Sequence, residues 1–129
     1  MRPFPVFLAF GRLILAVSVL LGVPVHAQSN PKNVVATERT RAELLAHAPE
    51  GLEPGKPVWV GLQLAHQPDW HSYWKNSGDS GLPTRLEWTL PPGVVAGEVA
   101  WPMPRKYPIG TLINYGYADT VLLPVPLTI

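Results

Sequence analysis

Cysteine is absent from this chain of 129 residues. No disulfide can crosslink it, and it holds no thiolate that could attack a disulfide. Clustered positive charge is also lacking, because the ten Lys and Arg residues are scattered and nine Asp and Glu residues nearly balance them. Without a basic patch, neither nucleic acid nor an anionic membrane surface is an expected partner.

The apolar run near the N-terminus is too short to span a membrane. It covers residues 13–25 between Arg12 and the small-residue sequence Val25-His26-Ala27, whereas a membrane-spanning helix needs about 20 apolar residues. A positive start, an apolar middle and a small-residue end are typical of a secretory signal peptide. We expect residues 1–27 to be a signal peptide cleaved after Ala27, and residues 28–33 to be a flexible leader.

Segments of helix length are scarce after Ala27, because prolines and glycines divide the sequence into short apolar pieces. One of these, Thr40–His47, has helical propensity, but Pro49 and Gly51 follow it so closely that we expect a strand. In Val58–His66, apolar side chains alternate as in a strand with one buried face. Short strands at this spacing indicate an all-β fold, an antiparallel β-sandwich, over residues 34–129. The predicted strands are Thr40–His47, Val58–His66 and residues 85–90, 95–101, 111–117 and 121–129.

Residues 70–83, with the sequence WHSYWKNSGDSGLP, contain the letters G-D-S-G that surround the nucleophilic serine of trypsin-like proteases. Such a protease needs two barrels, which the 102 residues after Ala27 cannot form, and Leu82 stands where that family has a second glycine. Asn, Asp, Ser and Gly also favour tight turns. We therefore interpret residues 76–81 as a turn and Ser80 as non-catalytic.

Three potential metal ligands, His66, Asp69 and His71, lie within six residues. Pro68 interrupts the run between them, and no established ligand motif is present. We expect ordinary hydrogen-bonded histidines at a strand edge and no cofactor.

Aromatic residues are dense for a small domain. We expect most tryptophans to pack in the core, whereas the tyrosines and the polar turn are candidates for recognition of a partner. The expected structural anchors are Trp59, Trp70, Trp74, Trp88 and Trp101, and the candidate docking residues are His71, Tyr73, Asn76, Asp79, Ser80, Tyr115 and Tyr117.

Several motifs in sequence order, PG..VWVGL, WH.YWKN.GDSGLP, W.LP.GV, WP.P and NYGY, carry a resemblance to a known family. From residue 34 to residue 129 the chain resembles the N-terminal periplasmic domain of DsbD-type thiol:disulfide interchange proteins, in particular the suppressor-of-copper-sensitivity branch. The resemblance implies an immunoglobulin-like sandwich in the periplasm of a Gram-negative bacterium. It also implies a polytopic parent protein that carries electrons to periplasmic thiol proteins, with no cofactor beyond its thiols.

The missing cysteines set this chain apart from the chemistry of that family. The sequence also stops at Ile129 within an apolar alternating run, so we expect a domain truncated at its C-terminal end. The preferred hypothesis is a non-catalytic domain of a protein-disulfide reductase that docks periplasmic thiol proteins and the remaining domains of its parent. Only segments beyond Ile129 would then associate with a membrane. The alternative is a free-standing secreted domain that binds a protein, a glycan or a metal ion, and DNA sequence past Ile129 would distinguish the two.

Overall fold

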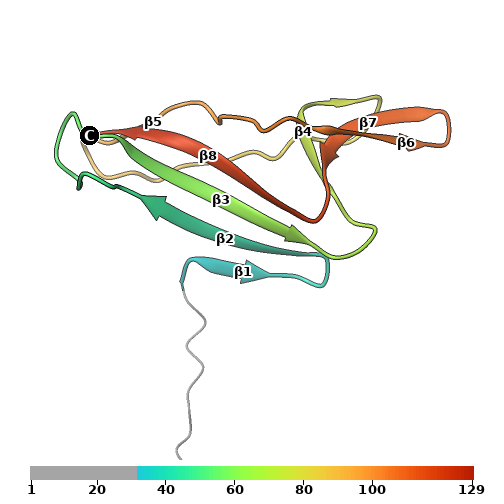
Figure 1. The fold of residues 1–129 in the computed structure, drawn as a ribbon, viewed down its shortest axis with the longest axis horizontal. Helices are drawn as coiled ribbons and strands as arrows, with labels where there is room; N and C mark the ends of the chain where they lie inside the picture. Colours follow the sequence, from blue (N-terminus) through green and yellow to red (C-terminus); the bar gives the residue numbers. More distant parts are fainter. Residues whose placement is uncertain (1–31) are drawn as a thin grey trace, which may run out of the picture.

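The structure, a computed structural model, describes residues 32–129. The expected signal peptide lies outside these residues, as does most of the expected leader. The described chain is all-β and folds into two antiparallel sheets (Figure 1), which confirms the predicted sandwich-like class, and no helix in it is long and apolar enough to cross a membrane. The strands are β1 (Val34–Ala36), β2 (Thr40–His47), β3 (Val58–His66), β4 (Ser72–Gly78), β5 (Val95–Ala96), β6 (Arg105–Ile109), β7 (Leu112–Tyr117) and β8 (Thr120–Thr128).

The larger sheet has the strand order β1-β2-β3-β8-β5. Its centre is the pairing of β3 with β8, in which Leu62 lies opposite Leu123 and Leu64 opposite Val121. The alternation predicted for β3 is present: Val58 and Leu64 are buried, whereas Trp59 on the other face is 37% exposed. Strands β2 and β3 have the predicted bounds. Strand β3 was predicted from its alternation, and β2 from the Pro and Gly residues that follow it.

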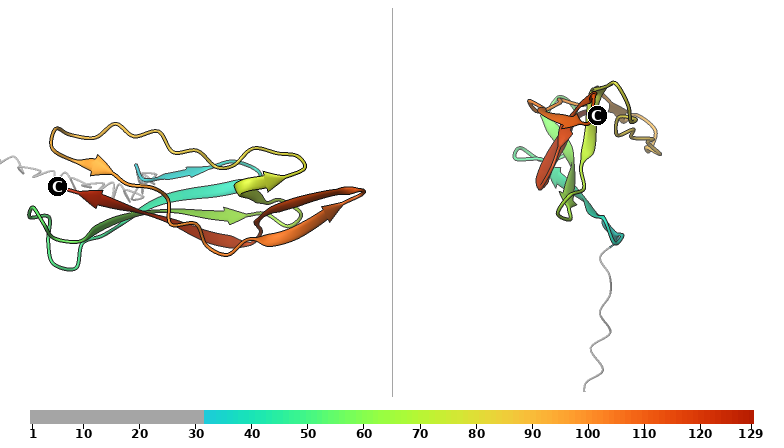
Figure 2. Two further views of the ribbon diagram at one scale, coloured as in Figure 1. Left: turned by 90° about the horizontal axis from the view of Figure 1, so that it is seen from above. Right: turned by 90° about the vertical axis from the view of Figure 1, so that its right-hand side faces the viewer.

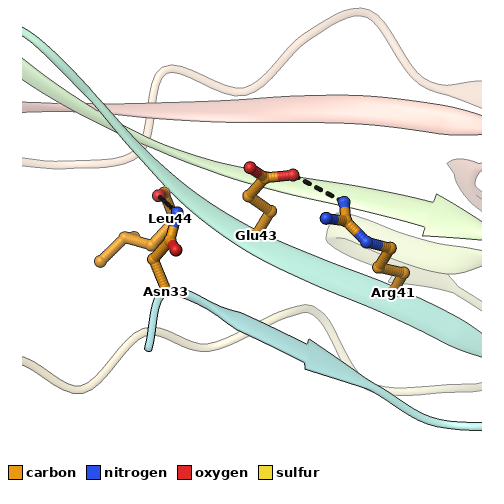
Figure 3. A network of polar contacts seen from close by, with 4 residues as sticks. All are labelled: Asn33, Arg41, Glu43 and Leu44. Atoms are coloured by element: carbon orange, nitrogen blue, oxygen red, sulfur yellow. Dashed lines mark hydrogen bonds and ion pairs between the residues drawn. The ribbon is translucent and has the colours of Figure 1, made fainter. Parts of the chain in front are cut away.

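The edge strand β1 is held to β2 by polar contacts close to the first described residues (Figure 3). The side-chain amide of Asn33 donates to the carbonyl oxygen of Leu44 at 3.0 Å, and the backbone amide of Leu44 donates to the carbonyl oxygen of Asn33 at 2.8 Å. On β2, Arg41 and Glu43 form an ion pair at 2.6 Å. These contacts attach the first strand of the described chain, which starts at Val34, to the larger sheet.

The smaller sheet has the order β4-β7-β6 and lies at one end of the molecule (Figure 1). Strand β7 passes into β8 of the larger sheet through Ala118 and Asp119 alone. The long connection from β4 to β5 has no regular structure and runs along one side of the molecule, as the first view in Figure 2 shows. This connection and residues 97–104 make up the rest of the second layer.

The core lies where the two sheets meet. Leu64 of β3 and Val121 and Leu123 of β8 pack there with Tyr117 of β7, and Trp74 of β4 covers them from the smaller sheet. Val99 and Trp101, from the irregular segment before β6, are packed against the same cluster. Buried apolar surface from both sheets thus stabilises the arrangement without any disulfide.

Three predictions about the strands are wrong. Residues 85–90 form no strand, and the strand expected at residues 95–101 is reduced to Val95–Ala96. Strand β6, in contrast, forms at Arg105–Ile109, where no strand was predicted. The pattern of a strand is local, but a strand exists only where a neighbour accepts its hydrogen bonds. Pro108 is tolerated in β6 because β6 is an edge strand.

Candidate functional site

An aromatic cluster of His71, Tyr73 and Tyr107 lies on one face of the smaller sheet. Tyr73 is paired with Gly116, and Tyr107 with Asn114, and residues two apart on a strand share a face. The His71 ring stacks on Tyr107 with their centroids 4.9 Å apart and meets Tyr73 edge to face at 5.0 Å. Two of the predicted docking residues are therefore in direct contact, and Tyr107 is a third member that sequence analysis missed.

The loop of residues 78–81 folds back onto this cluster, fixed by hydrogen bonds to β7. The backbone amide of Asp79 donates to the carbonyl oxygen of Ile113 at 2.9 Å, and the amide of Ile113 donates to the carboxylate of Asp79 at 2.7 Å. Asn76 and Ser77 add bonds within the turn, to the amide of Gly78 and the carbonyl oxygen of Gly81. Of the predicted turn at residues 76–81, residues 79–81 form a loop tied to the sheet, whereas residues 76–78 are the end of strand β4.

Ser80 is hydrogen-bonded to an amide side chain. Its hydroxyl donates to Oδ1 of Asn114 at 3.0 Å. An amide oxygen cannot take up the hydroxyl proton as a histidine base does, and no histidine is bonded to Ser80 within residues 32–129. The geometry gives Ser80 a structural role in holding the turn.

Three buried polar atoms on this face of the sheet have no hydrogen-bond partner in the described part of the chain. Two belong to the cluster, Nε2 of His71 and the hydroxyl of Tyr107, and the third is Nδ2 of the neighbouring Asn114. Asn114 itself is only 1% exposed. Buried polar groups in native proteins are nearly always paired with protein or with ordered water. This face of the sheet therefore offers unmet hydrogen bonds beneath an aromatic surface.

Tyr115 and Tyr117 differ sharply in accessibility. Tyr115 is half-buried and meets Trp74 edge to face, with ring centroids 6.3 Å apart. Tyr117 is 5% exposed, and its hydroxyl donates to the carbonyl oxygen of Pro102 at 2.8 Å. Burial raises the pKa of the Tyr117 phenol. Tyr117 belongs to the core, which removes it from the candidate docking residues.

The five tryptophans occupy three kinds of environment. Trp74 and Trp101 pack against the core, and Trp88 lines a groove at the surface. Trp59 and Trp70 are exposed, and the Arg39 guanidinium lies 4.3 Å from the centre of the Trp70 ring. Neither is the core anchor that we expected: Trp59 lies on the outer face of β3, and the ring of Trp70 is covered by a cation instead.

The potential metal ligands are not brought together. Nδ1 of His66 donates to the carbonyl oxygen of Asp119 at 2.9 Å, and His71 is stacked in the aromatic cluster. Among residues 32–129 no group of three or more His, Cys, Asp or Glu side chains is arranged to hold a metal ion.

Comparison with known proteins places the chain in a family. The model for the N-terminal part of the thiol:disulfide interchange protein DsbD matches residues 41–129. The fold is similar to the crystal structure of the N-terminal periplasmic domain of ScsB from Proteus mirabilis, with a TM-score of 0.58 and 19% identity over 74% of this chain. The match spans only 37% of that chain. Among curated proteins, none matches significantly.

Proposed function

Because this chain belongs to the family of DsbD N-terminal domains, we propose that it is an exported, non-catalytic docking domain of a membrane thiol:disulfide reductase. The observation that carries the proposal is the family match across residues 41–129 of a chain without cysteine. Thiol–disulfide exchange proceeds by thiolate attack on a sulfur. These residues can therefore bring redox partners together, but the cysteines that exchange electrons must belong to other segments or proteins.

The aromatic cluster and its turn are the proposed docking surface for periplasmic thiol proteins. His71 and Tyr73 are partly exposed, and Asn76, Asp79 and Ser80 are exposed beside them. Aromatic rings with polar neighbours are enriched in protein interfaces.

Site-specific photocrosslinking in cells tests the proposal. The full chain is expressed with its leader, and benzoylphenylalanine replaces Tyr73 or Asn76 in turn. The control carries the same group at Leu52, which is exposed in the β2–β3 connection. We expect adducts with thiol:disulfide proteins from the Tyr73 and Asn76 positions and none from Leu52. Adducts formed equally at all three positions, or none at Tyr73 and Asn76, would contradict the docking role.

A further inference from the structure

A surface groove separates two extended segments of the second layer. Residues 82–88 lie on one side and residues 97–101 on the other, and Lys75 completes the lining. The groove has a volume of about 630 Å³. Both segments were predicted as strands, and neither is paired with the other, so the groove lies where the second layer lacks a strand.

Residues 84–90 have the side-chain pattern of a strand. Leu86, Trp88 and Leu90 are partly buried, whereas Arg85 and Glu87 between them are exposed. A period of two is the period of an extended strand with one buried face. Within the described residues, no hydrogen bond joins the backbone of residues 82–90 to any other segment. The amides and carbonyls of this strand-like segment are available for pairing.

The opposite side of the groove is fixed to the larger sheet. The amides of Gly97 and Ala100 donate to the carbonyl oxygens of Pro126 and Pro124, both at 2.8 Å. Glu98 and Val99, which line the groove, have no backbone partner among residues 32–129. One wall is therefore held in place by β8, while unpaired backbone is present on both walls.

The lining combines an apolar floor with cations at its rim. Leu86, Trp88, Val99 and Trp101 supply apolar surface, and Lys75, Arg85 and Glu98 supply charge. Arg85 forms an exposed ion pair with Glu87 at 3.5 Å. Because such exposed pairs contribute little, a carboxylate of a partner can replace Glu87 beside Arg85, and the lining suits a strand that alternates apolar and acidic side chains.

We propose that this groove binds an extended segment of a partner polypeptide, which adds as a strand beside residues 84–90. Its apolar side chains pack toward Trp88 and Trp101, and its acidic side chains lie near Lys75 and Arg85. Main-chain hydrogen bonds supply affinity, and the alternate side chains supply specificity. The inference rests on the proposed docking role and specifies one partner segment, at a site separate from the aromatic cluster.

The test uses the full chain and three capped synthetic peptides as probes. The first alternates Val and Glu, the second is the same peptide with alternate backbone nitrogens methylated, and the third replaces Glu by Lys. Fluorescence anisotropy measures affinity, and amide hydrogen exchange followed by NMR locates the contact. We expect the first peptide to bind and to protect the amides of residues 85–90. The methylated peptide should bind at least about tenfold more weakly, because several hydrogen bonds of roughly 1 kcal/mol each are lost.

Two charge variants test whether Arg85 makes the groove prefer acidic over basic side chains in the peptide. Arg85→Glu should weaken binding of the Val-Glu peptide by about threefold and strengthen binding of the Val-Lys peptide, since exposed charge pairs contribute less than about 1 kcal/mol. Arg41→Glu, on β2 and away from the groove, is the matched control and should leave both affinities unchanged. Circular dichroism of each variant establishes that it is folded.

Three results would overturn the inference: equal binding of the methylated peptide, protection confined to an edge such as β1, or a dimer of the chain that occupies the groove and excludes the peptide. If crosslinks at Tyr73 persist while no peptide binds, the groove assignment alone fails. If the peptide binds but those crosslinks are absent, the docking role of the aromatic cluster fails.

Discussion

The hydroxyl of Ser80 donates a hydrogen bond to Oδ1 of Asn114 across 34 positions of sequence, at 3.0 Å. Asn114 is almost fully buried at the centre of the smaller sheet, and its amide nitrogen has no partner in the described residues. Within the described residues, Ser80 is therefore the hydrogen-bond partner of the Asn114 side chain, and this bond closes the turn over the aromatic cluster.

Ser80→Ala should lower the free energy of unfolding by about 1 kcal/mol, because it leaves the buried oxygen of Asn114 unpaired. Urea unfolding followed by tryptophan fluorescence measures the change. Thr89→Ala is the control: Thr89 is exposed and has no side-chain hydrogen bond within residues 32–129, so its effect should stay within about 0.5 kcal/mol. Equal effects of the two substitutions would show that the Ser80 bond contributes nothing.

Ser80 should not react with a fluorophosphonate probe. Its partner is an amide oxygen, and the hydroxyl lacks the base that activates a serine nucleophile. Intact-mass spectrometry after incubation with the probe measures labelling, with a trypsin-like protease as the positive control. An adduct mapped to Ser80 would revive the protease interpretation.

Gly81→Ala should destabilise the fold more than Gly93→Ala. Both glycines have φ of +86°, so both substitutions carry the cost of a left-handed backbone, about 1–2 kcal/mol. A Cβ at residue 81 would also overlap the ring of Tyr73, whereas a Cβ at residue 93 would meet nothing within 4 Å. The excess at residue 81 should be at least about 1 kcal/mol in the same urea assay. Matched losses would mean that the turn does not pack on Tyr73.

Tyr117→Phe should remove one component of the loss of stability in alkali. Burial raises the pKa of Tyr117 in the folded protein above the usual value of about 10. The unfolded phenol then releases its proton first, so the contribution of Tyr117 is complete below about pH 10 and is lost as the pH rises through the folded pKa. Urea unfolding between pH 8 and roughly pH 11 measures this.

The same substitution also leaves the Pro102 carbonyl oxygen without its partner, which should cost about 1 kcal/mol at neutral pH. Tyr115→Phe retains Tyr117 and serves as the control, with the alkaline loss preserved. If Tyr117→Phe and the parent lose stability in parallel above pH 10, the buried phenol is not responsible.

Zn²⁺ or Cu²⁺ should leave the melting temperature unchanged. Among the residues that the structure describes, His66 and His71 are engaged in separate contacts, and no third ligand joins them. A ligand that binds only the folded state raises the melting temperature. A concentration-dependent rise that His66→Ala abolishes would establish a metal site.

Local pattern predicted strands β2, β3, β7 and β8 to within a residue at each end. Strands β2 and β3 have the predicted bounds, and the last part of the predicted turn, residues 79–81, is present, because alternation and turn chemistry act over a few residues. Residues 85–90 show the same alternation but have no neighbour within the described chain. Pairing is a property of the sheet and is not encoded in the segment alone.

The candidate site was predictable in composition but not in burial. His71 and Tyr73 were identified as candidate docking residues, yet Tyr107 was missed because no strand was predicted between residues 101 and 111. Tyr115 and Tyr117 both lie in the motif NYGY. Tyr117 is buried and its hydroxyl donates to the carbonyl oxygen of Pro102, whereas Tyr115 is half-buried. Sequence spacing does not distinguish a core tyrosine from a surface one.

The corner at Ala118 and Asp119 joins the two sheets. Only these two residues separate β7 from β8, and the carbonyl oxygen of Asp119 accepts bonds from both the backbone amide and Nδ1 of His66, at 2.7 and 2.9 Å. Both bonds fix Asp119 to the end of β3. The corner is therefore anchored to the larger sheet at the point where the chain enters β8.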